Sequence, residues 1–185
     1  EVRRSRRLVI SFIATVANYE YGFYWYFYQD GTIEFDGKLT GIVSTGALPP
    51  GETTPYGQLL NRDGLYGPIH QHFFNFRLDL DVDGQRNQVY EVHTEATPPG
   101  EENPHGNAYR PVKALLQSEQ EAQQTVDVMS TRHWWIVNPE VTNEIGEPVA
   151  YKLIPHGNVL PFFQPDSGVA KRAVFATKHF WATRY

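Results

Sequence analysis

The sequence predicts an all-β fold, a large antiparallel β-sandwich, on three observations. Apolar and polar residues alternate with a period of two along most of the chain, as they do in strands with one wet face. Clusters of Gly, Pro, Asp and Asn separate these runs and are typical of turns. The 185 residues are enough for one domain with its own hydrophobic core, and no internal repeat divides them. We therefore expect a single all-β domain over residues 1–185.

The first predicted strands form a hairpin. Tyr19–Tyr28 (YEYGFYWYFY) is almost entirely aromatic, so a strand here would be covered on both faces. Asp30-Gly31 is a typical hairpin turn. The next run, Thr32–Val43, alternates as a strand with a wet face does. Its apolar parity comprises Ile33, Phe35, Leu39 and Val43, and its polar parity comprises Glu34, Asp36, Lys38 and Thr40.

The clearest alternation predicts a strand over His70–Val82, after a long polar loop at 49–64. One face carries His70, His72, Phe74, Phe76, Leu78, Leu80 and Val82, and the other carries Gln71, Asn75, Arg77, Asp79, Asp81 and Asp83. Asp83-Gly84 would turn the chain into a returning strand, Asn87–Thr94. A second loop rich in Pro, Gly and acidic residues follows at 97–106.

The last third of the chain is less uniform. Leu115–Thr125 (LLQSEQEAQQT) has helical composition, whereas its neighbours favour strands, and both alternatives stay open. Further short strands are predicted at Trp134–Val137, Val149–Ile154 and Val174–Phe180, with Asn138-Pro139 among the breakers between them. The sequence starts and stops in the middle of a pattern, so we expect a fragment of a larger protein.

Composition excludes several classes of function. The formal net charge of −5 disfavours a nucleic-acid partner held by bulk charge. No run approaches the roughly 18 apolar residues of a membrane span, and Leu8-Val9-Ile10 is too short for a signal sequence. We expect a soluble protein without a membrane partner, in a compartment that the sequence leaves open. Aromatic residues make up 14% of the chain, so their rings must either be buried or serve a function.

The absence of cysteine excludes disulfides and thiolate sites, so histidine nitrogen and carboxylate oxygen must bind any transition metal. His70 and His72 flank Gln71, and on a strand they would share one face about 6.5–7 Å apart. They could converge on one metal, or they could be two half-buried histidines. A cupin-type site is disfavoured because no Glu follows the pair within a few residues. A third ligand would be needed, and the remaining histidines show no compelling spacing.

The run Thr15–Tyr21 (TVANYEY) resembles the T-x-x-N-Y-[DE]-Y signature of copper-containing, quinone-dependent amine oxidases. The neighbouring residues 22–35 (GFYWYFYQDGTIEF) are similar to the same family's adjacent strands, and the histidine pair falls at the spacing of two copper ligands. The resemblance covers essentially the whole chain. It implies that residues 1–185 are the central part of the catalytic β-sandwich, with flanking parts missing at both ends.

The resemblance also implies roles for individual residues. Tyr19 would be the precursor of topaquinone, formed from its own side chain by copper and dioxygen, and its oxidised ring would form a Schiff base with a primary amine. Asn18 would position the quinone by restricting its rotation. His70 and His72 would bind copper. A second, calcium-like site would use Asp79, the Leu80 carbonyl and Asp81, which otherwise form part of a polar strand end.

By the same resemblance, the intact protein would convert primary amines and dioxygen to aldehyde, ammonia and hydrogen peroxide, as a homodimer. The third copper histidine would lie beyond Tyr185, and the catalytic aspartate base and a quinone-bonding tyrosine would precede Glu1. We therefore expect the isolated chain to be inactive and to bind copper weakly. The identity of the amine is not predicted.

Two other classes of protein remain as alternatives. The chain could be a non-catalytic β-sandwich module whose exposed Trp and Tyr rings stack on a ligand. It could also be a structural relative that keeps the oxidase fold without the cofactor, although the survival of Tyr19, His70 and His72 argues against this. Quinone at Tyr19 distinguishes the alternatives, because only the oxidase requires it.

Overall fold

The structure is a computed structural model that describes residues 2–156 and 158–184. The expected cut ends, at Glu1 and Tyr185, lie outside the described residues. The chain forms two compact units, residues 1–71 and 72–185. Nearly all regular structure is β-strand, so the all-β fold class is confirmed. That the chain is a single partial domain stays a prediction.

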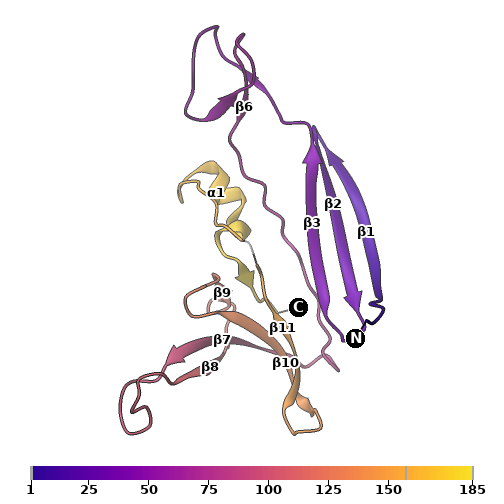
Figure 1. The fold of residues 1–185 in the computed structure, drawn as a ribbon, viewed down its shortest axis with the longest axis vertical. Coiled ribbons are helices and arrows are strands. Elements are labelled where there is room, and N and C mark those ends of the chain that lie inside the picture. Colours follow the sequence, from indigo (N-terminus) through magenta and orange to yellow (C-terminus); the bar gives the residue numbers. More distant parts are fainter. Residues whose placement is uncertain (1, 157, 185) are drawn as a thin grey trace. The chain divides into compact units, whose positions relative to one another are not determined.

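The first unit contains a three-stranded antiparallel sheet in the order β1-β2-β3 (Figure 1). Its strands are β1 (Arg7–Val16), β2 (Tyr19–Tyr28) and β3 (Ile33–Gly41). The aromatic strand and the hairpin that follows it are therefore confirmed, and β1 is an additional strand. Aromatic rings pair across the ladders, with centroids 4.9 Å apart for Phe12–Phe23 and 5.0 Å for Trp25–Phe35. Such cross-strand pairs stabilise the register of the central strand.

A smaller sheet is formed within and on both sides of the segment expected to be a long loop, residues 49–64. It consists of β4 (Gly46–Ala47), β5 (Gly57–Leu59) and β6 (Leu65–Pro68), in the order β4-β6-β5. Of these strands only β5 lies within residues 49–64, and its three residues are too few to show alternation. β6 ends two residues before His70, so this sheet leads the chain into the histidine pair.

The predicted strand over His70–Val82 is wrong. No residue of this run belongs to a strand in the described structure, and most of its apolar side chains are exposed, with Phe76 at 41% and Leu78 at 45%, whereas Val82 is buried. Alternation specifies which side chains share a face, but a strand also needs a neighbour for its N–H and C=O groups. None of the described strands pairs with this run. Asp83-Gly84 is accordingly a bend and not a hairpin turn.

The second unit is built on a four-stranded antiparallel sheet in the order β11-β10-β7-β8. The strands are β7 (Gln88–Ala96), β8 (Tyr109–Leu115), β10 (His133–Thr142) and β11 (Pro148–Leu153). Trp134 is fully buried at the centre and stacks on Phe180, with ring centroids 4.4 Å apart. The predicted strands in these regions are confirmed. Asn138-Pro139 does not end β10, because the strand continues through an irregularity in its register with β11 after Asn138.

The structure decides one open alternative and corrects one prediction in the remaining segments. Leu115–Thr125 is not helical: the chain turns at Ser118 and then forms β9 (Gln123–Gln124), which pairs with β12 (Phe180–Trp181). The predicted strand over Val174–Phe180 is mostly the 3₁₀ helix η1 (Val174–Thr177). It follows α1 (Gly168–Arg172), whose start is capped by the Ser167 side chain. No helix among the described residues has the length and apolar character needed to cross a membrane.

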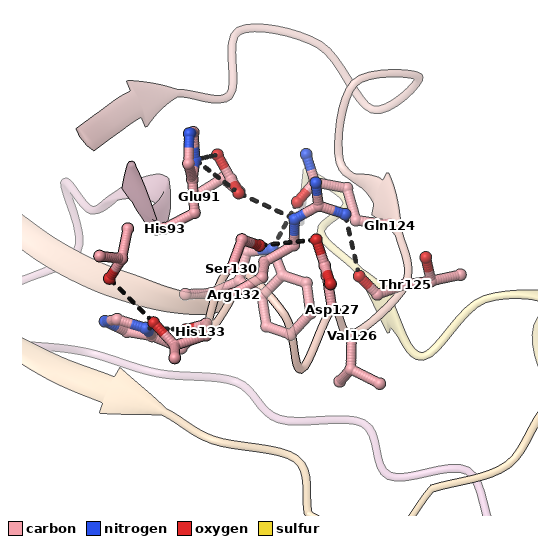
Figure 2. A network of polar contacts seen from close by, with 12 residues as sticks. Glu91, His93, Gln124, Thr125, Val126, Asp127, Ser130, Arg132 and His133 are labelled. Atoms are coloured by element: carbon pink, nitrogen blue, oxygen red, sulfur yellow. Dashed lines mark hydrogen bonds and ion pairs between the residues drawn. The ribbon is translucent and has the colours of Figure 1, made fainter. Parts of the chain in front are cut away.

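A polar network joins β7 to the segment that precedes β10, around the buried carboxylate of Glu91 (Figure 2). Arg132 donates through Nε to Glu91 at 2.8 Å and through a terminal nitrogen to the Thr125 carbonyl at 3.2 Å. His93 lies 3.0 Å from Glu91 through Nδ1 and 3.0 Å from Glu95 through Nε2. The buried charge therefore has cationic or hydrogen-bonding partners on both sides, as burial of a carboxylate requires.

We predict that Arg132→Ala weakens this part of the second unit by about 2 kcal/mol, because Glu91 loses a charged hydrogen-bond partner at a buried position. Amide hydrogen exchange in β7 and β10 of the full-length protein should accelerate roughly 30-fold. Arg86→Ala is the control, because the Arg86–Glu140 pair is exposed at 83% and 59% and contributes little. Equal exchange rates in the two variants would contradict the assigned role of Glu91.

The carboxylates of Glu95 and Glu91 raise the pKa of His93 above its ordinary value, because both ring nitrogens donate to them when the imidazole is protonated. The stabilisation is therefore complete below the unfolded pKa of about 6.5 and is lost as pH rises through the folded pKa. We expect the His93 ring protons to titrate above pH 6.5 by NMR. Glu95→Gln should lower the midpoint, and an unchanged midpoint would exclude Glu95 as the cause.

Candidate active site

Tyr19 is fixed at the start of β2 by a two-residue turn. Val16 pairs with Tyr19, and the intervening Ala17 and Asn18 connect β1 to β2. Ala17 has a φ of 53°, the positive value that tight hairpin turns require at a central position. A non-glycine residue here costs about 1 kcal/mol of backbone strain. The strand pairing on both sides of β2 holds the turn, and therefore the direction of the Tyr19 side chain.

The Tyr19 hydroxyl forms hydrogen bonds with residues of the first unit. The backbone N–H of Ser44 donates to the Tyr19 oxygen at 3.1 Å. His70 Nε2 lies 2.9 Å from the same oxygen. The phenol oxygen thus accepts a hydrogen bond from the Ser44 N–H and lies within hydrogen-bond distance of the His70 imidazole.

The tautomer of His70 follows from its second contact. His70 Nδ1 lies 2.8 Å from the Pro68 carbonyl oxygen, which can only accept, so Nδ1 carries the ring proton. In the neutral imidazole, Nε2 then carries the lone pair and accepts the proton of the Tyr19 hydroxyl. A backbone carbonyl on one ring nitrogen is the usual way in which a metal-binding histidine presents its other nitrogen.

The donor chemistry of His70 fits copper. Imidazole nitrogen is a preferred ligand of copper, and His70 Nε2 is oriented with its lone pair outward from the Pro68 contact. His72 is exposed and begins the second unit, and its binding of copper stays a prediction. Among residues 2–156 and 158–184, no three His, Asp or Glu side chains are grouped closely enough to hold a metal ion.

Asn18 is exposed, and its described contact is made by its backbone. The Asn18 carbonyl accepts from the N–H of Ile42 at 2.7 Å. That its side chain restricts the ring at Tyr19 therefore stays a prediction.

The second predicted metal site lies in the second unit. Asp79 and Asp81 are exposed and Leu80 is half-buried. The backbone just after them is fixed: the Asn138 side chain donates to the carbonyls of Val82 and Asp83 at 2.9 and 3.0 Å. Calcium binding by Asp79, Leu80 and Asp81 stays a prediction.

Sequence reasoning missed three residues that hold Tyr19 and His70. Ser44 and Pro68 act through backbone atoms, which leave no trace in residue type. Gly41 pairs with Tyr19 and has a φ of 111°. A glycine at the end of an alternating strand was the available signal, because such a glycine often marks a close backbone approach.

Comparison with known proteins agrees with the motifs. A family model described as "Copper amine oxidase, enzyme domain" matches residues 1–185. The chain is 53% identical over 185 residues to a primary amine oxidase of Arthrobacter sp. (strain P1), covering 100% of this chain and 28% of that protein. It is 49% identical over 189 residues to a peroxisomal copper-containing diamine oxidase of Nicotiana tabacum, covering 100% of this chain and 24% of that protein.

A solved structure supports the same assignment. The copper-containing benzylamine oxidase of Hansenula polymorpha superimposes with a TM-score of 0.92 at 32% identity, covering 99% of this chain and 29% of the other. This likeness agrees with the predicted β-sandwich. The chain spans about a quarter of the length of these curated relatives. With the family match over residues 1–185, these likenesses show that the chain belongs to the copper amine oxidase family, as part of its enzyme domain.

Proposed function

We propose that the full-length protein oxidises primary amines to aldehydes, with release of ammonia and hydrogen peroxide, using copper and a topaquinone made from Tyr19. The observation that carries this proposal is the 2.9 Å contact between the Tyr19 hydroxyl and His70 Nε2, in a chain of the copper amine oxidase family. When bound, copper and the quinone would supply an electrophilic carbonyl and a route for electrons from the amine to dioxygen.

The chain's own residues contribute orientation and a proton acceptor. A phenol with an ordinary pKa near 10 is a weak nucleophile and a weak reductant at neutral pH. The Ser44 N–H and His70 Nε2 hold the Tyr19 oxygen from two sides, and the proton of the hydroxyl is directed at the imidazole. Loss of that proton would leave an electron-rich ring in a fixed position, which favours its oxidation.

Further residue roles belong to the same proposal. His72 is the second copper ligand, Asn18 restricts the quinone, and Asp79, Leu80 and Asp81 form a calcium site with hard oxygen ligands. A homodimeric full-length protein, and an isolated chain that is inactive and binds copper weakly, are also part of it. Dioxygen and a primary amine are the substrates.

We predict that Tyr19→Phe abolishes quinone formation in the full-length protein, because phenylalanine has no oxygen to activate. The measurement is visible absorbance and redox-cycling staining after addition of copper and air. Tyr21→Phe is the matched control: the two rings lie on one strand with centroids 6.3 Å apart, and the control should stain as the unmodified protein does. Staining that persists in Tyr19→Phe would exclude Tyr19, and no staining in any version would favour a non-catalytic binding module.

His70→Ala should remove both copper retention and quinone formation, because Nε2 is both the proposed ligand and the acceptor of the phenol proton. Metal analysis after dialysis, combined with staining, checks this. His133→Ala is a suitable control, since His133 in the second unit contacts the Thr131 carbonyl. Full copper occupancy in His70→Ala would contradict the assignment.

A third prediction follows from the tautomer of His70. Copper and the Tyr19 hydroxyl require the same lone pair on Nε2, so copper must displace a hydrogen bond worth about 1 kcal/mol. Tyr19→Phe should therefore bind copper about fivefold more tightly than the unmodified protein in anaerobic competition titrations. Weaker binding in Tyr19→Phe would instead make the phenol oxygen a metal ligand.

A further inference from the structure

We propose that the main chain of residues 41–44, named here the Tyr19 cradle, positions Tyr19 for its oxidation, and that Gly41 is the positioning residue in it. This inference rests on the proposed function of Tyr19. It concerns a residue with no side chain, which acts by allowing one backbone segment to lie against another.

The first contact of the cradle is at the Cα of Tyr19. Gly41 pairs with Tyr19 in the β2–β3 ladder. A Cβ atom on Gly41 would lie 2.4 Å from the Asn18 carbonyl oxygen, 2.8 Å from the Tyr19 Cα and 2.9 Å from the Glu20 nitrogen. All of these atoms belong to the backbone, so no side-chain rotation could relieve the overlap. The φ of 111° independently disfavours any residue other than glycine.

The second contact is one residue further along. The N–H of Ile42 donates to the Asn18 carbonyl at 2.7 Å, the same oxygen that faces Gly41. This bond lies one residue beyond the last pair of the β2–β3 ladder, and it connects the cradle to the turn formed by Ala17 and Asn18. It therefore ties the position of residues 41–42 to the turn that starts β2.

The third contact is at the far end of the side chain. The N–H of Ser44 donates to the Tyr19 hydroxyl oxygen at 3.1 Å. One short segment thus holds Tyr19 at its Cα and at its hydroxyl. Because residues 41–44 are consecutive, a displacement at Gly41 is transmitted to Ser44, and both ends of the tyrosine lose their support together.

The geometry leaves little room for such a displacement. A Cβ contact under 3.0 Å must be relieved, so Gly41→Ala has to move the two backbones apart by more than half an ångström. The Tyr19–His70 bond is 2.9 Å long, and hydrogen bonds of this kind become weak beyond about 3.2 Å. A misplacement of about 1 Å in a reacting group can cost a factor on the order of 100 in rate.

The test compares glycine-to-alanine variants of the full-length protein. Gly41→Ala is the variant of interest. Gly37→Ala, in the same strand, would make only ordinary contacts of 3.5 and 3.7 Å with the Phe35 ring. Gly31→Ala has a strained φ of 86° but meets no atom within 4 Å. Gly37→Ala controls for the replacement of a glycine in this strand, and Gly31→Ala controls for backbone strain without a steric overlap. Neither of these glycines pairs with Tyr19.

Two readouts are required. In crystals of the copper-free protein, the distance from the Tyr19 oxygen to His70 Nε2 should exceed 3.5 Å in Gly41→Ala and stay near 2.9 Å in both controls. After addition of copper and air, quinone should form at least 10-fold more slowly per bound copper in Gly41→Ala, and at the normal rate in the controls. A purely structural role would lower the melting temperature without changing the rate per folded, copper-loaded protein.

The inference is overturned if Gly41→Ala keeps both the distance and the rate. If Gly41→Ala does not fold, Ser44→Pro replaces it, because proline removes the N–H that reaches Tyr19 while adding no atom beside the Tyr19 Cα. An unchanged distance and rate in Ser44→Pro would overturn the inference equally. Failure of the proposed function looks different: the unmodified protein would form no quinone, while the distances in the copper-free crystals would still report on the cradle.

Discussion

The hydrogen bond between the Tyr19 hydroxyl and His70 Nε2 is the interaction on which the candidate site depends. It joins residues 51 positions apart, after the chain has formed β3 and the small β4-β6-β5 sheet. Its length is set by backbone features on either side: a strained two-residue turn before Tyr19 and a carbonyl contact at Pro68.

The second unit follows a different physical rule. There a buried carboxylate, Glu91, requires charged partners, and Arg132 and His93 supply them. Such a network is sensitive to pH and to loss of one partner, because an unpaired buried charge is costly. The Tyr19 site, held by main-chain groups and strand pairing, responds to displacement of the backbone instead. The two sites therefore call for different kinds of substitution when they are tested.

Family membership indicates the class of reaction, but it does not by itself assign a role to each residue. The match to copper amine oxidases extends over residues 1–185, whereas the geometry brings together Tyr19 and His70 in the first unit. The metal-binding roles proposed for His72, Asp79 and Asp81 rest on motif and spacing. All three residues are exposed in the second unit. Close to Asp81 the backbone is held by the Asn138 side chain, which donates to the carbonyls of Val82 and Asp83.

The sequence alone determined the fold class, the aromatic strand Tyr19–Tyr28, the turn after it and the motif that marks Tyr19 and His70. These features are local: periodicity, turn residues and short motifs are properties of neighbouring positions. Only the tertiary structure decided that His70–Val82 forms no strand, that Leu115–Thr125 is not helical, and that Gly41 and Ser44 hold Tyr19. The reason is physical: strands and close backbone contacts need a partner distant in the chain, and residue type along one segment does not specify that partner.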